Sequence, residues 1–81
     1  MSRNLAPIVK VSSNSGFMAN QRVIATDVEA SPPQRYTGRI NSVWSDGTAV
    51  VTWDYPLNHQ AERHLVSSGH VRLHHLNRTT S

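Results

Sequence analysis

The sequence predicts a small all-β domain built as a barrel of five short strands, and three features of the chain point to it. Apolar and polar residues alternate along residues 35–44 and 48–54, which is the two-residue period of a strand with one buried face. Asp46-Gly47 lies between these runs and is a strong hairpin signal, because glycine adopts a positive φ without strain. No stretch has an evident helical period, so we expect the strands to close on one another.

Turn or loop residues bound each expected strand. A polar loop with two consecutive prolines, residues 27–34, separates the first two strands. In the second strand, Tyr36, Ile40 and Trp44 share one parity. Gly38 has the same parity and predicts a sharp bend or a close backbone approach. The five expected strands are residues 21–26, 35–44, 48–54, 60–66 and 71–76, with a short 3₁₀ turn over 67–70 before the last one.

The two ends of the chain are expected to lie outside the barrel. Residues 1–20 form a flexible N-terminal segment in this interpretation, because proline and a run rich in serine, asparagine and glycine oppose a helix there. Phe17 and Met18 are the residues of this segment that could dock onto the domain. The barrel then occupies residues 21–76, and residues 77–81 form a frayed C-terminal tail.

Composition excludes several classes of protein. The chain has 81 residues, which is the size of a single domain, and it has no cysteine for a disulfide, a thiolate metal ligand or a nucleophile. It has no signal-peptide core and no membrane-spanning run of about 18 apolar residues, so we expect a soluble, cytoplasmic protein without a membrane partner. Because a core this small is only marginally stable, we also expect a homo-oligomer.

The charged residues favour an anionic partner. Eight lysine and arginine residues face five aspartate and glutamate residues, which gives a formal charge of +3, and all but one of the eight are arginine. The planar guanidinium group matches phosphate and carboxylate groups, so the excess of arginine favours nucleic acid or an acidic peptide.

Metal binding and catalysis have little support in the sequence. Strand parity scatters the histidines, and no cysteine or cluster of carboxylates completes a ligand set, so we expect no metal and no cofactor. Asp46, Asp54 and Glu62 are the carboxylates nearest to a catalytic arrangement, but no nucleophile accompanies them. An enzyme is therefore the minority interpretation, and no catalytic residue is assigned. The five histidines are His59, His64, His70, His74 and His75.

The predicted order of strands, loops and turns resembles that of SH3-like barrels. Within that group, Tyr36-Thr37-Gly38-Arg39-Ile40 and Val51-Thr52-Trp53-Asp54-Tyr55 resemble the second and third strands of Tudor-like domains. The resemblance implies a cage for a methylated cation, with Tyr36, Trp53 and Tyr55 at the matching positions. The loop at 27–34 departs from the family pattern, because it lacks the aromatic residue that commonly completes the cage.

The overall plan of the chain is also similar to that of the plasmid-borne type II dihydrofolate reductases. Those enzymes have a similar length, with an N-terminal segment before a five-stranded barrel. The resemblance implies a homotetramer whose copies share one central pore for folate and NADPH. A Val-Gln-Ile-Tyr segment lines that pore in the family, whereas the nearest equivalent here, Glu62-Arg63-His64-Leu65, differs from it.

The leading prediction is a non-enzymatic binding module that recognises a peptide or a nucleic acid through a groove with aromatic and arginine side chains. The alternative is a homo-oligomeric ligand-binding barrel or enzyme with a shared pore. Trp53, like Trp44, is open to a second interpretation as a core or subunit-interface residue. The candidate ligand-binding residues are Tyr36, Arg39, Trp53, Tyr55 and Arg63.

Overall fold

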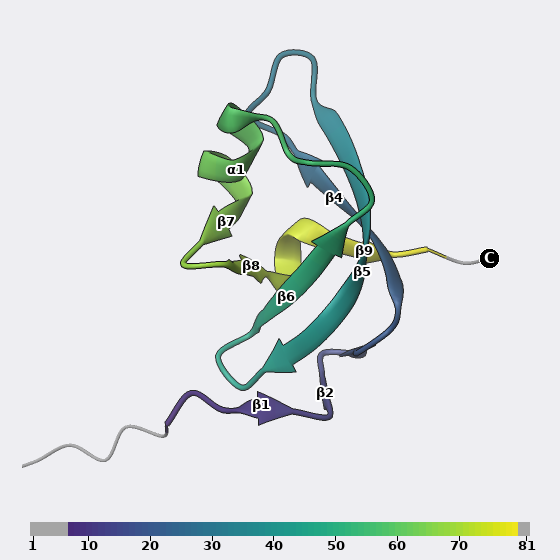
Figure 1. Cartoon of the computed structure of the whole chain (residues 1–81), viewed down its shortest axis with the longest axis vertical. Coiled ribbons are helices and arrows are strands. Elements are labelled where there is room, and N and C mark those ends of the chain that lie inside the picture. Colours follow the sequence, from purple (N-terminus) through teal and green to yellow (C-terminus); the bar gives the residue numbers. More distant parts are fainter. Residues whose placement is uncertain (1–6, 80–81) are drawn as a thin grey trace, which may run out of the picture.

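The computed structural model describes residues 7–79, and strands make up most of it (Figure 1). Its centre is an antiparallel meander of β4 (Arg22–Asp27), β5 (Gln34–Trp44) and β6 (Thr48–Trp53). The expected loop and hairpin connect these strands. The predicted all-β class is confirmed, and the first three expected strands are each found within about two residues of their predicted ends.

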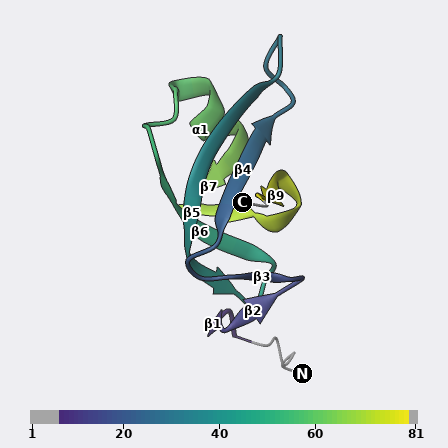
Figure 2. The same cartoon turned by 90° about the vertical axis from the view of Figure 1, so that its right-hand side faces the viewer.

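Short strands extend the curled meander at both edges. β8 (His70–Arg72) pairs with β6, and β7 (Val66–Ser67) pairs with β8. After a 3₁₀ turn at Leu73–His75, β9 (Leu76–Arg78) returns to pair with β4. The sheet order is therefore β7-β8-β6-β5-β4-β9, with the last strand beside the first long one (Figure 2).

The hairpin predicted at Asp46-Gly47 is confirmed. Gly47 has a φ of +82°, and its N–H donates to the Trp44 carbonyl at 3.2 Å. A shift in the β5–β6 register between Ile40 and Ser42 places one extra residue on β5. Beyond this bulge Val43 is buried while Trp44 is only half-buried, which corrects the single parity expected for the whole strand.

The core lies inside the curl of the sheet, between the meander and the segment that follows it. Alternate residues of β4, β5 and β6 point inward, as the two-residue period predicts. The chain from the helix to β9 covers them from the other side. The buried hydrophobic residues are Val23, Ala25, Ile40, Val43, Ala49, Val51, Ala61, Leu65, Val71, Leu73 and Leu76.

The prediction of a fourth strand at residues 60–66 is wrong, because α1 (His59–Leu65) occupies most of that segment. Asn58 begins the helix, since its Oδ1 atom accepts a hydrogen bond from the Ala61 backbone N–H at 2.7 Å. Ala61 and Leu65 lie four residues apart on one side of the helix and are both buried. Two apolar positions in seven residues are too few to show a helical period in the sequence.

The 3₁₀ turn is also placed differently from the prediction. Residues 67–70, where it was expected, instead contain the tight turn between β7 and β8, with positive φ values at Ser68 (53°) and Gly69 (80°). The 3₁₀ turn lies after β8, at Leu73–His75. Its position lets Leu73 and Leu76 both enter the core.

The described part of the segment expected to be flexible contains three short strands, β1 (Lys10–Val11), β2 (Ser13–Asn14) and β3 (Phe17–Met18). β1 pairs with the end of β5, and β2 pairs with β3. The expected docking of Phe17 is found, because its ring packs against the core beneath the Arg78 guanidinium group at 5.8 Å. Residues 1–6 of that segment, and residues 80–81 of the expected C-terminal tail, lie outside the described residues.

Across residues 7–79, the structure contains no helix with the length and hydropathy needed to cross a membrane.

Gly38 provides a test of how closely the strands pack. A Cβ atom at this position would lie 2.7 Å from the Thr52 carbonyl oxygen and 2.8 Å from Val51 Cγ1. Gly38→Ala is therefore expected to lower the free energy of unfolding by about 1–3 kcal/mol, measured by urea denaturation. Thr52→Ala, an exposed change on the adjacent strand, is the control and should cost less than about 1 kcal/mol. Equal stabilities of the two variants would contradict the close approach.

Candidate nucleic-acid interface

The meander of β4, β5 and β6 has a second face, which points away from the core and which we call the outer face. The inward positions on β4 and β5 are occupied by core residues, so the side chains between them point to the outer face. α1 lies on the opposite side of these strands (Figures 1 and 2). The outer-face residues are Arg22 and Ile24 of β4, Arg35, Thr37 and Arg39 of β5, Thr52 of β6, and Asp54, which lies just after the end of β6.

The strand register places the cations of the outer face near one another. Arg22 lies directly opposite Arg39, and Arg39 in turn lies opposite Thr52. Arg35 lies four residues before Arg39 on the same strand, which is about 13 Å at the rise of an antiparallel strand. The outer face therefore carries two guanidinium groups along β5, with a third on β4 opposite Arg39.

Asp54 supplies the one carboxylate among these outer-face residues, and its oxygens are already engaged. Arg22 binds it through two parallel hydrogen bonds, Nη1 to Oδ1 at 2.8 Å and Nη2 to Oδ2 at 2.6 Å. The Thr37 hydroxyl donates to Oδ2 at 2.6 Å. These bonds, from Arg22 first and Thr37 next, lower the pKa of Asp54 to about 2. The carboxylate is therefore ionised at neutral pH and orients Arg22.

The Arg39 side chain is held by one hydrogen bond and is still exposed on the outer face. Its Nη1 donates to the Asn20 carbonyl oxygen at 3.0 Å, which leaves the rest of the guanidinium group for a ligand. A shallow pocket of about 340 Å³ opens beside it, with Arg22, Thr52 and Asp54 also in its wall. The Asp54 carboxylate offsets the charge of Arg22, so Arg35 and Arg39 leave a surplus of positive charge on this surface that is suited to an anion.

The structure does not bring all five predicted site residues together. Arg39 points to the outer face, whereas Tyr36 and Trp53 point to the opposite side of the sheet and pack, half-buried, against the core. The Tyr36 hydroxyl accepts a hydrogen bond from Asn58 Nδ2 at 2.9 Å. Tyr55 is 79% exposed just beyond β6, and Arg63 is exposed on α1.

Sequence reasoning missed Arg22 as a candidate. Val23 and Ala25 share the buried parity of the first strand, so the alternation alone indicates that Arg22 faces solvent. Its position opposite Arg39 depends on the pairing register of β4 and β5, and its contact with Asp54 depends on a residue 32 positions away. The local sequence contains neither fact.

No protein-family model, curated protein or solved structure matches this chain. The resemblances to Tudor-like domains and to the type II reductases therefore stay predictions. The segment compared with the reductase pore motif, residues 62–65, lies in α1, where Leu65 is buried. Among residues 7–79, no three histidine, aspartate or glutamate side chains lie close enough to hold a metal ion.

The Asp54 carboxylate gives the outer face a pH-dependent contribution to stability. Its folded pKa of about 2 lies below its usual value of 3.8, so the contribution is complete above about pH 4 and is lost as the pH falls towards 2. Asp54→Asn is expected to lower the thermal unfolding midpoint at neutral pH, and the gap to the unmodified chain should close as the pH approaches 2. Calorimetry over this pH range measures the gap.

Glu62→Gln is the control for this experiment, because it removes an exposed carboxylate from α1. Its midpoint should track that of the unmodified chain over the same pH range. High salt should narrow the Asp54→Asn gap at neutral pH, since the ion pair is exposed to solvent. A gap of constant size down to pH 2 would show that the carboxylate charge contributes nothing.

Proposed function

We propose that this chain is a non-enzymatic, SH3-like barrel module that binds single-stranded nucleic acid on its outer face. One observation carries the proposal: Arg22, Arg35 and Arg39 share a solvent-facing surface on which the neighbouring carboxylate, Asp54, is already engaged. Because Asp54 offsets the charge of Arg22, the surplus positive charge is that of Arg35 and Arg39, and such a surplus attracts a polyanion. The arrangement of cations along one strand favours an extended ligand over a single small anion.

The path of the chain supports the SH3-like part of the proposal. If the two-residue strands are set aside, five strands follow in the order β4, β5, β6, β8 and β9. A 3₁₀ turn separates the last two, and the fifth strand returns to pair with the first. This is the order expected from the SH3-like resemblance, with a short helix inserted between the third and fourth strands.

Tyr55 supports a single strand over a duplex as the ligand. It directly follows Asp54 and is 79% exposed, so its ring is open to a ligand. An exposed ring stacks on an unpaired base, whereas the bases of a duplex are already stacked on one another. Cationic side chains and exposed aromatic rings are the two elements from which sequence-tolerant single-strand sites are built.

Removal of one arginine tests the electrostatic part of the proposal. Arg39→Ala is expected to weaken binding of a fluorescent oligothymidylate and to reduce the slope of log K against log salt by about 0.7, the value for one lost phosphate contact to a single strand. Fluorescence anisotropy over a range of salt concentrations measures both quantities. Lys10→Ala is the matched control, because it removes one exposed positive charge from β1 and should leave the slope unchanged.

Two results would overturn this part of the proposal. One is an affinity that does not vary with salt. The other is an equal effect of Arg39→Ala and Lys10→Ala, which would reduce the interaction to net charge. Binding to polyglutamate with no binding to oligothymidylate would replace nucleic acid with an acidic peptide as the partner.

The stacking part of the proposal has a separate test. Tyr55→Ala is expected to weaken oligothymidylate binding about tenfold, because one base–aromatic stack is worth roughly 1–3 kcal/mol, while the salt slope stays the same. Tyr55→Phe keeps the ring and should bind like the unmodified chain. An unchanged affinity in Tyr55→Ala would remove this residue from the site. Circular dichroism of both variants checks that the exposed change leaves the fold intact.

A further inference from the structure

A second depression lies at the end of the sheet where β4 begins and β9 ends, and we call it the end pocket. Figure 2 shows the β2–β3 hairpin beneath this end of the sheet. The pocket has a volume of about 650 Å³, and none of the described residues in its wall is an aspartate or a glutamate. Its lining residues include Phe17 of β3, Arg22 of β4, Arg78 of β9 and Thr79.

The end pocket adjoins the cationic part of the outer face. Arg22 lines both the end pocket and the shallow pocket beside Arg39. Arg39 lies opposite Arg22 across the β4–β5 ladder, and Arg78 lies opposite the next residue of β4, Val23. Because neighbouring strands are about 4.8 Å apart, the backbone of β9 lies only about 10 Å from that of β5. A strand that crosses Arg39 and Arg22 therefore reaches the end pocket within one more strand spacing.

The Arg78 side chain is held in place, yet most of its N–H groups remain for a ligand. Its Nη1 atom donates to the Gly16 carbonyl oxygen at 3.2 Å, and its guanidinium carbon lies 5.8 Å from the centre of the Phe17 ring. A Cβ atom on Gly16 would lie 3.3 Å from Nη1, so the glycine leaves room for this contact. Nε and Nη2 make no hydrogen bond within residues 7–79, and the side chain is exposed. A guanidinium group that is already oriented loses less conformational freedom when a ligand binds.

Arg78 also carries a charge that no described carboxylate offsets. The ion pairs within residues 7–79 are Arg22–Asp54 and His64–Asp27, and Arg78 takes part in neither. The end pocket therefore adds a third unpaired guanidinium group to the two that β5 supplies to the outer face.

We infer that a nucleic-acid strand bound to the outer face continues past Arg22 into the end pocket, where Arg78 binds one of its backbone phosphates. This inference rests on the proposed function and extends its site from β4 and β5 to β9. A guanidinium group binds two phosphate oxygens through two parallel hydrogen bonds. Arg78 has the Nε–H and Nη2–H groups that this geometry requires, because the Gly16 carbonyl engages only Nη1.

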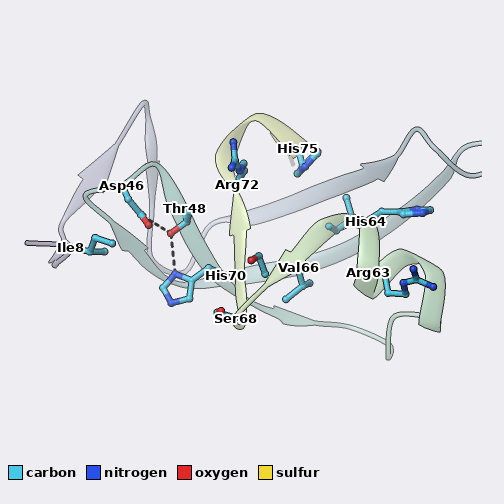
Figure 3. Close-up of a pocket in the computed structure, with 12 residues that line it drawn as sticks. Ile8, Asp46, Thr48, Arg63, His64, Val66, Ser68, His70, Arg72 and His75 are labelled. Atoms are coloured by element: carbon cyan, nitrogen blue, oxygen red, sulfur yellow. Dashed lines mark hydrogen bonds between the residues drawn. The ribbon is translucent and has the colours of Figure 1, made fainter.

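Two other exposed arginines lie outside this path and provide a control. Figure 3 shows Arg63 on α1 and Arg72 on β8 in the wall of a separate pocket, with their side chains well apart. Asp46 also lines that pocket, so negative charge is present there. Neither arginine lines the end pocket or the shallow pocket beside Arg39. Arg63→Gln therefore removes one exposed positive charge without touching the path of the strand.

Salt titrations of the full chain with a fluorescent oligothymidylate test the inference. Arg78→Gln is expected to weaken binding and to reduce the slope of log K against log salt by about 0.7, the value for one phosphate of a single strand. Together with Arg39→Ala the reduction should reach about 1.4, because the two arginines contact different phosphates of one strand. Arg63→Gln should leave the slope unchanged. Fluorescence anisotropy gives the affinity at each salt concentration.

A conservative variant separates phosphate binding from a purely structural role of Arg78, which also fastens the β2–β3 hairpin to β9. Arg78→Lys keeps the positive charge but loses the planar fork, so it should retain the salt slope and bind less tightly than the unmodified chain. Equal losses of affinity in Arg78→Lys and Arg78→Gln, with the salt slope unchanged in both, would overturn the inference. In the unmodified chain, the NMR signal of the Arg78 Nε–H group should shift when oligothymidylate is added, and this measurement needs no variant.

The length of the ligand separates this inference from the proposed function. An oligothymidylate too short to pass Arg22 should bind Arg78→Gln and the unmodified chain equally, and longer ones should distinguish them. If Arg39→Ala weakens binding at every length and Arg78→Gln at none, the inference fails while the outer-face proposal stands. If only Arg78→Gln weakens binding, the outer-face proposal fails and the Arg78 contact stands. Absence of binding at every length would overturn both.

Discussion

Gly38 lies where three strands of the sheet meet, opposite Val23 of β4 and Trp53 of β6. The backbone of β6 approaches so closely that a Cβ atom on Gly38 would meet the Thr52 carbonyl oxygen. A residue without a side chain is therefore required at this point of the curled sheet. Since side chains alternate along a strand, fixing Gly38 on the inner side also fixes the direction of every residue of β5 before the bulge.

This constraint separates the aromatic and cationic residues of β5. Tyr36 and Ile40 follow Gly38 to the inner side, where they pack with Trp53 against or within the core. Arg35 and Arg39 follow the opposite parity to solvent. An aromatic cage bordered by these arginines would need both sets on one face, which a regular strand does not allow. The cations instead join Arg22 across the β4–β5 ladder.

The fold was predictable where the signals were local. Alternation predicted the three long strands, and Asp46-Gly47 and Gly38 had the roles assigned to them. The helix was missed because its seven residues bury only Ala61 and Leu65, so its boundary depends on the Asn58 cap more than on a hydrophobic period.

The candidate sites were predictable only in part. Arg39 and Tyr55 are exposed, as a ligand-binding role requires. The anionic partner that the excess of arginine favours stays a prediction. Two features could not be found from sequence alone. The pairing of Arg22 with Asp54 joins residues 32 positions apart, and one pocket is lined by residues of both α1 and β8. Both depend on strand register and on how the chain folds back over the sheet, which residue spacing does not encode.

The central claim is that the β5 register creates a cationic outer face on which a nucleic-acid strand lies. Titration of the ¹⁵N-labelled chain with an unphosphorylated oligothymidylate, followed through backbone amide and arginine side-chain NMR signals, tests it most directly. We expect shifts that cluster at Arg22, Arg39, Thr52 and Tyr55 and spare α1 and the β7–β8 hairpin. Shifts confined to α1 and the β7–β8 hairpin, or to the side of the sheet that carries Tyr36 and Trp53, would contradict it.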